Sequence, residues 1–456
     1  MPGAQPSRRG RNPGHAEISR FIAFPRWLVP IEPAGVVLTD HAVAVRDGQI
    51  EALLPAAEAR ARFADYPVIE LGEHVLIPGL VNAHTHAAMT LMRGLADDLP
   101  LMRWLEEHIW PAEKRHVSAE FVRDGTLLAC AEMLRGGITC FNDMYFFPDA
   151  ALEAALEAGM RSSHGIIVIE FPSAYAADAA DYLRKGLELR DRYRDEPLAS
   201  FCLAPHAPYT VSDASFRQIA TLAAELDLPV HVHVHETDHE IQASLAEHGV
   251  RPLERLRRLN LVAPNLIAVH AVHLTAEEIA LLARHGCSVA HCPSSNMKLA
   301  SGFAPVARLA AAGVNIALGT DGAASNNRLD LLEETRLAAL LAKAVAGDAQ
   351  AMPAHAALRA ATLGGAQALG LADRIGSIAV GKAADLAAIA LRGLELAPCF
   401  DPVSQLVYAA GREHVTHVWV AGEARVTEGK LLSGALSRLE NRGRLWQNAL
   451  GSLAEH

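Results

Sequence analysis

The chain has 456 residues, of which 51% are hydrophobic and 20% charged, a balance typical of a globular enzyme with a sizeable core. Its net charge of −11, without a basic cluster, argues against a nucleic-acid-binding surface, and no apolar stretch is long enough to cross a membrane. The six cysteines are scattered and form no C-x-x-C pair, which favours free thiols in the cytoplasm over a disulfide framework.

The first part of the chain predicts a tail followed by strands. Residues 1–20 are rich in Pro, Gly and Arg, a composition typical of a disordered tail. The apolar stretch that follows is interrupted by Pro25 and Arg26 and is too short for a signal peptide. Short apolar runs punctuated by Gly and Pro predict strands over residues 21–75, and a similar texture returns over residues 383–435. We expect these two segments to pair into one small β-sandwich domain.

Residues 76–382 alternate short β-branched runs with helical stretches that end in Gly or Pro, the pattern of repeated βα units with a parallel sheet. Eight units can be counted, with strands expected at 79–86, 137–144, 164–170, 201–207, 229–236, 266–273, 287–293 and 315–322. Eight such units predict an α/β fold of the (β/α)8 TIM-barrel type. Residues 436–456 are predicted to form a C-terminal helix.

Most of the expected strands end in a residue that can bind a metal. The carboxyl ends of all barrel strands open onto one face, where active sites lie. We expect nine such side chains to converge there: His84, His86, His206, His233, His235, Glu236, His270, His273 and Asp321. His84 and His86 share one side of a strand, because side chains at i and i+2 point the same way. Taken alone, this pair fits hydrogen-bonded core histidines equally well, but the other strand ends complete a nitrogen and oxygen set that suits Zn²⁺ or a similar ion.

Five stretches of the chain carry a resemblance to a known family. In chain order they are PGLVNAHTHAAMTLMRGLADDLPLMRWLEEHIWPAE, HVHET, HAVHL, PSSNMKLASGFAPV and GTDGAASNNRLDLLEE. Together they resemble the amidohydrolase superfamily, and within it the deaminases of 5'-methylthioadenosine and S-adenosylhomocysteine. The similarity runs roughly from Leu76 to Asp385 and covers most of the chain.

The resemblance implies a catalytic site with one divalent ion per subunit, preferably Zn²⁺. Its ligands would be His84, His86, His233 and Asp321. The family spacing H-x-x-E implies Glu236 as the catalytic acid/base. His270 and Asp321 would orient the attacking water and accept its proton. An ion in such a site lowers the pKa of its water from ~16 to ~7.

The resemblance also implies where the substrate is held. Glu113 and His206 match substrate-binding positions, with Glu113 directed at ribose hydroxyls, and Trp104 would line the thioether end. Glu236 and Asp321 would contact the substrate as well. Because free bases lack a ribose, Glu113 favours a nucleoside.

One departure from the family concerns the third strand. The family usually places an arginine a few residues after a Gly-Met-Arg turn, whereas here Arg161 lies inside the turn and no arginine follows it in the strand. We expect the pocket to differ on that side, with His164 or Glu170 near it. The missing arginine argues against S-adenosylhomocysteine as a substrate. It has less bearing on the expected deamination of the adenine ring.

The stretch PVHVHVHETDH, residues 229–239, also contains H-E-x-x-H, the signature of zinc metalloproteases. That signature requires a helix, whereas the alternating valines here predict a strand, with a helix beginning only near Thr237 or Asp238. His235 competes with His233 as the ligand, and only the family spacing separates them. We expect His231, deeper in the barrel, to pack or to hydrogen-bond a ligand.

Other kinds of metal site are not favoured. A dinuclear centre bridged by a carboxylated lysine on the fourth strand is excluded, because no lysine occurs between Lys185 and Lys298. The zinc site of cytidine deaminases needs P-C-x-x-C, which is missing. Asn296 either contacts substrate or caps a turn, and His291 is expected to pack beside the site.

The resemblance therefore implies hydrolytic deamination of an adenine nucleoside, 5'-methylthioadenosine first and S-adenosylhomocysteine or adenosine next, to the inosine analogue and ammonia. The alternatives are a guanine-type or pterin-type deaminase and a chlorotriazine hydrolase. A non-catalytic barrel is disfavoured, because a scaffold has no use for Glu236 beside an open metal position. We expect a cytoplasmic homo-oligomer, a dimer or tetramer, whose partner is a small molecule rather than a membrane or a nucleic acid.

Overall fold

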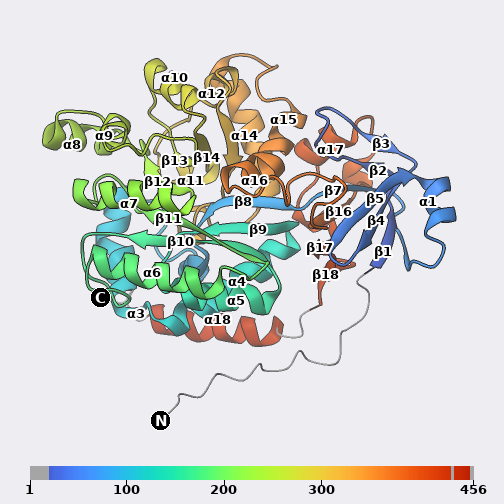
Figure 1. Cartoon of the computed structure of the whole chain (residues 1–456), viewed down its shortest axis with the longest axis horizontal. Coiled ribbons are helices and arrows are strands. Elements are labelled where there is room, and N and C mark those ends of the chain that lie inside the picture. Colours follow the sequence, from blue (N-terminus) through green and yellow to red (C-terminus); the bar gives the residue numbers. More distant parts are fainter. Residues whose placement is uncertain (1–19, 433–435, 452–456) are drawn as a thin grey trace, which may run out of the picture.

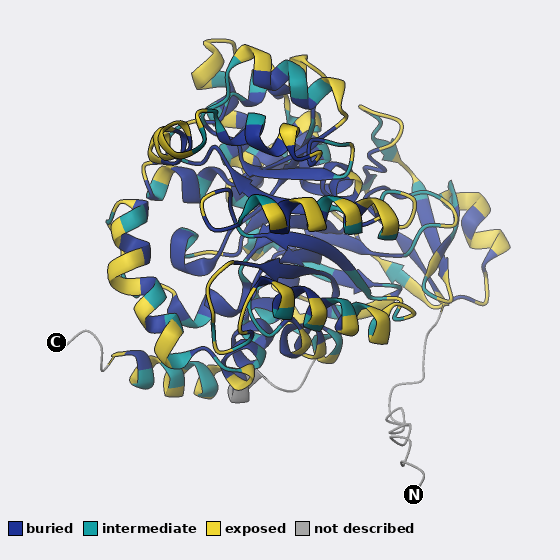
Figure 2. Ribbon diagram, turned by 60° about the vertical axis from the view of Figure 1, so that its left-hand side comes forward, coloured by how far each residue is buried: buried dark blue, intermediate teal, exposed yellow. Residues whose placement is uncertain are grey.

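The computed structural model describes residues 20–432 and 436–451. The tail predicted for residues 1–20 therefore lies outside the described residues, apart from Arg20. The described chain forms a large unit of strands surrounded by helices and a smaller unit of β-sheets beside it (Figure 1). Burial is concentrated in the strands and on the inner faces of the surrounding helices (Figure 2).

In the described chain, eight parallel strands follow one another around the larger unit in sequence order. They are β8 (Leu80–Thr85), β9 (Ile138–Asp143), β10 (Arg161–Val168), β11 (Ala199–Pro205), β12 (Val230–Val234), β13 (Leu266–His270), β14 (Ser288–His291) and β15 (Asn315–Leu318). The last strand returns to the first: the Asn82 amide bonds both the backbone and the hydroxyl of Thr320, and the Asp321 amide donates to the His84 carbonyl at 3.0 Å. The prediction of a (β/α)8 barrel is confirmed.

Helices cover the outside of the strands. They are α4 (Ala119–Arg135), α5 (Pro148–Ala158), α6 (Ala179–Tyr193), α7 (Asp213–Leu226), α8 (Asp238–His248), α9 (Pro252–Arg258), α10 (Ala276–Arg284), α11 (Pro293–Lys298), α12 (Val306–Ala311), α13 (Ala323–Asn326), α14 (Leu331–Ala346), α15 (Ala354–Arg359) and α16 (Gly365–Ala368). Several begin at a Ser, Thr or Asp whose side chain accepts from a backbone amide of the first turn, as at Ser118, Ser212 and Thr275.

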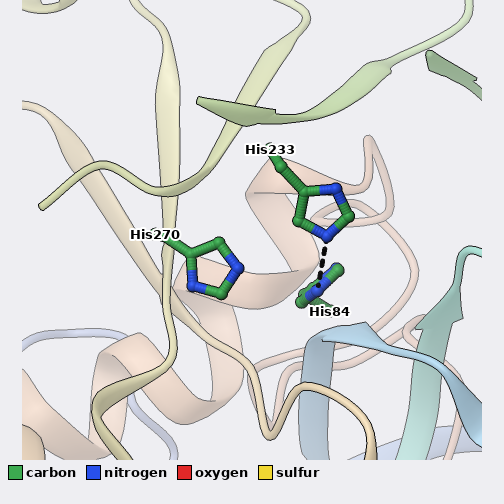
Figure 3. A group of neighbouring side chains, drawn as sticks. All are labelled: His84, His233 and His270. Carbon is green, nitrogen blue, oxygen red and sulfur yellow. Dashed lines mark hydrogen bonds between the residues drawn. The ribbon is translucent and has the colours of Figure 1, made fainter. Parts of the chain in front are cut away.

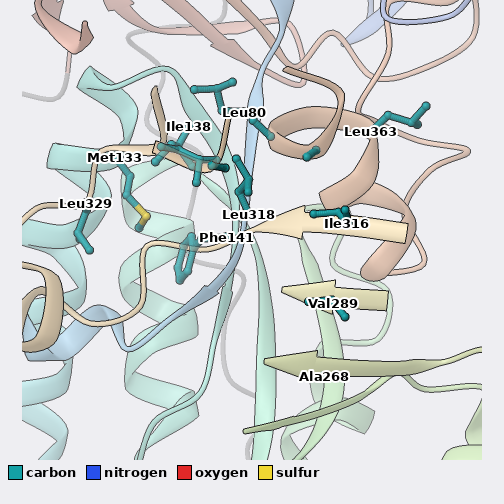
Figure 4. Packing of buried hydrophobic residues seen from close by; sticks show 14 of the residues in the cluster. Leu80, Met133, Ile138, Phe141, Ala268, Val289, Ile316, Leu318, Leu329 and Leu363 are labelled. Atoms are coloured by element: carbon teal, nitrogen blue, oxygen red, sulfur yellow. The ribbon is translucent and has the colours of Figure 1, made fainter. Parts of the chain in front are cut away.

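Alternate residues of each barrel strand pack on opposite sides. Leu80, Phe141 and Ile316 belong to the cluster that fills the space between strands and helices (Figure 4). Val81 and Ala317, their neighbours in sequence, belong to a second cluster. The strands are buried on both faces, and the polar residues within them, such as Asn82 and His164, are buried as well.

The smaller unit is built from both ends of the barrel sequence. One sheet has the order β5-β4-β1-β6 and the other β19-β18-β17-β16-β7-β2-β3 among the described strands. Their bounds are β1 (Arg20–Phe24), β2 (Trp27–Leu28), β3 (Leu38–Thr39), β4 (His41–Arg46), β5 (Gln49–Pro55), β6 (Val68–Glu70), β7 (His74–Pro78), β16 (Leu386–Ala390), β17 (Val415–Val420), β18 (Glu423–Thr427) and β19 (Lys430–Leu431). One cluster takes residues from both sheets, among them Phe21, Val43, Leu76 and Trp419, and forms the core of a sandwich. Helix α1 (Ala56–Arg62) covers the outer face of the four-stranded sheet, and α17 (Pro402–Tyr408) follows β16.

The last described helix, α18 (Leu436–Gly451), packs along α4 (Figure 1). The Trp446 indole donates to Asp124 at 2.9 Å and meets the Phe121 ring edge-on at 5.1 Å. Arg442 adds ion pairs to Asp124 and Glu120. None of the described helices is both long and apolar enough to span a membrane.

Arg161 joins the two units at the amino end of β10, far from the strand ends that were predicted to carry the chemistry. Its guanidinium donates to both carboxylate oxygens of Asp385, at 2.8 and 3.0 Å, and to the Pro197 carbonyl at 2.8 Å. The same carboxylate accepts from the Ala421 amide. Both side chains of the pair are less than 5% exposed. The arginine noted at the third strand is therefore a structural residue.

We expect Arg161→Met to destabilise the protein by about 3–5 kcal/mol, because it leaves the Asp385 carboxylate buried without its cation. Thermal unfolding should show the loss as a lower midpoint. In the double variant Arg161→Met/Asp385→Leu much of the stability should return, since no charge is then left uncompensated. A double variant as unstable as the single one would contradict this account.

Candidate active site

Four of the predicted residues meet at the carboxyl end of the barrel. The Asp321 Oδ1 atom lies 3.3 Å from His84 Nε2 and 3.2 Å from His86 Nε2. His233 Nε2 lies 3.3 Å from His84 Nε2, and Figure 3 shows their rings side by side with that of His270. The ends of β8, β12 and the loop after β15 thus bring together three imidazoles and one carboxylate.

These distances suit a single metal ion. With metal–ligand bonds of about 2.0–2.1 Å, neighbouring ligands of a four- or five-coordinate zinc ion stand about 2.9–3.6 Å apart. The separations of 3.2–3.3 Å lie within this range. Burial lowers the pKa of His84 to about 4 and also lowers that of His233, which favours the neutral rings that bind metals, whereas the contact of His86 with Asp321 raises the pKa of His86 to about 9 against the effect of burial. The residues present fit a divalent cation.

The outward-facing ring nitrogens of the three histidines are held by other groups. His86 Nδ1 lies 2.6 Å from the Met144 carbonyl, and His233 Nδ1 lies 2.7 Å from the His206 carbonyl. His84 Nδ1 contacts His231 Nε2 at 2.9 Å. Such contacts fix which nitrogen carries the proton and leave Nε2 free to bind a metal. His231 thus contacts a candidate ligand, in keeping with one of its two predicted roles.

Glu236 and His270 lie next to this cluster. The Glu236 carboxylate is 3.7 Å from His270 Nε2, and the His270 ring stacks on that of His233 at 5.5 Å. Burial raises the pKa of Glu236, and the Asp321 carboxylate adds to that effect. A carboxyl group with a raised pKa is suited to giving up a proton at neutral pH.

Three polar residues contact the groups of the site. The sequence motifs did not point to Ser295 or Glu240, and they left two possible roles for Asn296. Asn296, on α11, accepts from His270 Nδ1 through Oδ1 at 2.9 Å, so it neither caps a turn nor lines the main cavity. Ser295 donates to Asp321 Oδ2 at 2.7 Å. Glu240, in the first turn of α8, accepts from the backbone amides of His235 and Glu236. Their positions depend on loop geometry, which a single sequence does not reveal.

We expect Asn296→Leu to lower kcat by about 10–100-fold with little change in KM, because His270 loses the acceptor that keeps its proton on Nδ1. Asn296→Asp keeps an acceptor at that position and should recover most of the rate. Steady-state kinetics of the two variants test this role. Equal losses in both would point to a packing defect.

Other predicted residues lie elsewhere. His235 turns away at a left-handed backbone angle (φ 57°), and its ring nitrogens meet the Leu253 amide and the His273 carbonyl. Because His235 precedes α8 while His239 lies exposed on it, the pair does not form the metalloprotease helix. His164 is buried within β10 and Glu170 accepts from Ser212 and Ser215, so neither lines the cavity as was expected.

A concave pocket opens above the metal-binding candidates, and His86, His233 and Asp321 lie in its lining. One wall is a continuous helix formed by α2 (Leu101–Arg103), η2 (Trp104–Ile109) and α3 (Trp110–His116). Segment η2 is a π-helix, whose wider turn places Trp104 and Ile109 on the same side.

The polar groups of this cavity lie around its base. Glu113 accepts from the Tyr145 hydroxyl at 2.7 Å, and burial raises the pKa of Glu113 to about 7. His206 contacts Thr210 through Nδ1 at 3.0 Å, and burial lowers its pKa to about 3, so the ring is neutral at pH 7. Trp104, Glu113 and His206 all line the cavity, together with Glu236 and Asp321.

The family model described as "Amidohydrolase family" matches residues 75–425, more than half of the chain. The chain belongs to the amidohydrolase family. This confirms the resemblance read from the sequence motifs.

Curated relatives of this amidohydrolase are similar along almost their whole length. A protein of Teredinibacter turnerae is 47% identical over 93% of this chain and 96% of its own. A protein of Saccharophagus degradans is 46% identical over 94% of this chain and 96% of its own length. Both are named 5-methylthioadenosine/S-adenosylhomocysteine deaminase. Among solved structures, an adenosine deaminase from Xanthomonas campestris with bound zinc is 52% identical, with a TM-score of 0.92, covering 95% of this chain and 98% of that one.

Proposed function

We propose that this amidohydrolase is a hydrolytic deaminase of adenine nucleosides that converts 5'-methylthioadenosine to its inosine analogue and ammonia. The observation that carries the proposal is the Glu236 carboxyl group beside His270 and the donors His84, His86, His233 and Asp321, at the base of the main cavity. The names of the relatives support the same substrate class.

We propose that His84, His86, His233 and Asp321 hold one divalent ion, Zn²⁺ by preference for this donor set. When bound, the ion supplies Lewis-acid chemistry that lowers the pKa of a water to ~7. A mononuclear site is supported by the fact that the two groups of possible ligands in the described chain, one of His84, His86 and Asp321 and the other of His84, His233 and His270, share His84, and by the bound zinc of the Xanthomonas structure.

The protein groups would then divide the proton transfers. Glu236 protonates N1 of the adenine ring as the water attacks C6, and His270 and Asp321 hold the water and accept its proton. The exocyclic amine then takes up the proton that His270 and Asp321 accepted and leaves as ammonia, while the C6 hydroxyl returns its proton to Glu236 and becomes the carbonyl of the product. Glu113 would hold the ribose hydroxyls, since its carboxyl lies in the wall of the cavity.

The proposal is tested by ammonia release from the zinc-loaded protein with 5'-methylthioadenosine, adenosine, guanine, a pterin and a chlorotriazine. The adenine nucleosides should be turned over with a kcat/KM of ~10⁴ M⁻¹s⁻¹ or more, as for an ordinary enzyme on its own substrate. Turnover of guanine, the pterin or the triazine in preference to both nucleosides would overturn it.

We further propose that the enzyme acts in the cytoplasm as a homo-oligomer. In the described part of the chain all six cysteines are free, which suits a reducing compartment. Leu394 and Phe400, between β16 and α17, are 97% and 95% exposed, an unusual placement for large apolar side chains in a monomer. Sedimentation of the purified protein determines the oligomeric state.

A further inference from the structure

The described lining of the cavity above the proposed metal site contains no lysine or arginine that could pair with an anion. Its acidic groups are the carboxyls of Glu113, Glu236 and Asp321. The rest of the wall includes apolar residues of η2 (Leu105 and Ile109), of β10 (Ile167) and of the segment after β10 (Ile169). The histidines that line it gather at the metal-binding end.

Three aromatic side chains form the outer part of this wall. Trp110 and Phe171 meet edge-on with ring centroids 6.4 Å apart, joining α3 to the segment after β10. Tyr209 lies beside His206, at 6.0 Å between ring centroids. Phe171 and Tyr209 are 44% and 39% exposed, so they reach from the cavity to solvent. A substituent that extends outward from the base of the cavity therefore meets aromatic rings.

Three of the basic residues near the wall in sequence have carboxylate partners, whereas Lys114 and Arg115, which follow Glu113 on α3, are exposed and do not line the cavity. Arg103, next to Trp104, donates to both carboxylate oxygens of Glu107. Lys298, next to Leu299 of the wall, bonds Asp97 and the Ala324 carbonyl. Arg161, the arginine of the third strand, lies at the opposite end of β10 with Asp385. Each of these three cations is therefore neutralised by a carboxylate that does not line the cavity.

We propose that this enzyme selects adenine nucleosides whose 5' substituent is short and uncharged, such as methylthio, and discriminates against the amino-acid tail of S-adenosylhomocysteine. The proposal rests on the proposed deaminase function and narrows its substrate class. A carboxylate that enters this wall loses water and gains no cation, which is strongly unfavourable. A methylthio sulfur instead contacts aromatic rings favourably.

The test compares kcat/KM for 5'-methylthioadenosine, 5'-butylthioadenosine and S-adenosylhomocysteine with the zinc-loaded enzyme. The butylthio group has the same chain length as the homocysteine tail but no charge, so it separates the effect of size from that of charge. We expect the butylthio compound to lie within about tenfold of the methylthio compound, and S-adenosylhomocysteine at least about 100-fold below both.

A cation placed at the cavity mouth should reverse this preference. In Phe171→Arg we expect the ratio of kcat/KM for S-adenosylhomocysteine to that for the butylthio compound to rise at least about tenfold. Phe171→Gln, which is polar and uncharged, is the matched control and should leave that ratio within about threefold of the wild-type value. Phe171 is suited to the change because it is partly exposed.

The outcomes separate this proposal from the function on which it rests. If the wild-type enzyme deaminates S-adenosylhomocysteine within threefold of the butylthio compound, the selectivity is wrong while the deaminase function stands. An unchanged ratio in Phe171→Arg would likewise contradict the role of the aromatic mouth. If none of the three nucleosides releases ammonia, the proposed function itself fails.

Discussion

Glu236→Gln is expected to lower kcat by about 10³-fold or more, because glutamine cannot deliver a proton to the ring nitrogen as the water attacks. The carboxyl group is buried, its pKa is raised, and it lies 3.7 Å from His270. Glutamine has nearly the same shape, so the surrounding contacts should persist. Ammonia release and the zinc content of the purified variant should be measured together.

The matched control for this variant is Glu247→Gln. Glu247 lies on α8, its side chain is 74% exposed, and its replacement should change kcat by less than about twofold. Glu236→Gln with full zinc content and a near-normal kcat would refute the assigned role. Loss of zinc in that variant would instead indicate that Glu236 helps to hold the ion.

Removal of the metal is expected to abolish activity altogether. After dialysis against a chelator we expect less than about 1% of the starting rate, and one equivalent of Zn²⁺ per subunit should restore it. The thermal midpoint should fall by about 5 °C, because a ligand that binds only the folded protein stabilises it by mass action. If the chelated protein contains no metal by elemental analysis and is still fully active, the proposed mechanism is wrong.

The zinc content and activity of two histidine variants compare a candidate metal ligand, His233, with a histidine outside the site, His417. His233→Ala should lose zinc and activity together, because the site keeps only three of its four donors. His417→Ala, in the β-sandwich, where His417 stacks on Trp419, should retain both. Metal analysis by mass spectrometry measures the difference directly.

The barrel could be predicted because its signal is repeated. Each βα unit combines a short β-branched run, a helix and a Gly or Pro stop, so an error in one unit leaves the count of eight unharmed. The strands were placed with small errors at their ends, as at β10, which begins at Arg161 rather than at His164. His164 lies in the first half of β10, away from the carboxyl end where the cavity opens, and therefore does not line the cavity.

The metal-binding candidates were accessible to sequence reasoning for a related reason, since strand ends of a barrel share one face. Sequence reasoning from the strand pattern could not choose between His233 and His235 as the ligand, because strand alternation places both side chains on the same side. The structure separates them through the left-handed backbone at His235, where β12 has already ended and the side chain turns toward α9. Asn296 and Glu240 depend on the same kind of local loop geometry.

The division of the β-sandwich between the two ends of the barrel sequence has a consequence for synthesis on the ribosome. Strand β7 pairs with β16 along its whole length, yet the entire barrel is translated between them. Until β16 emerges from the ribosome, the apolar strand β7, His74–Pro78, has one edge whose backbone groups are unpaired. Such an edge can pair with the strands of other chains and cause aggregation. The nascent polypeptide must therefore protect this edge, by a chaperone or by a transient neighbour, for most of the time that a ribosome needs to complete it.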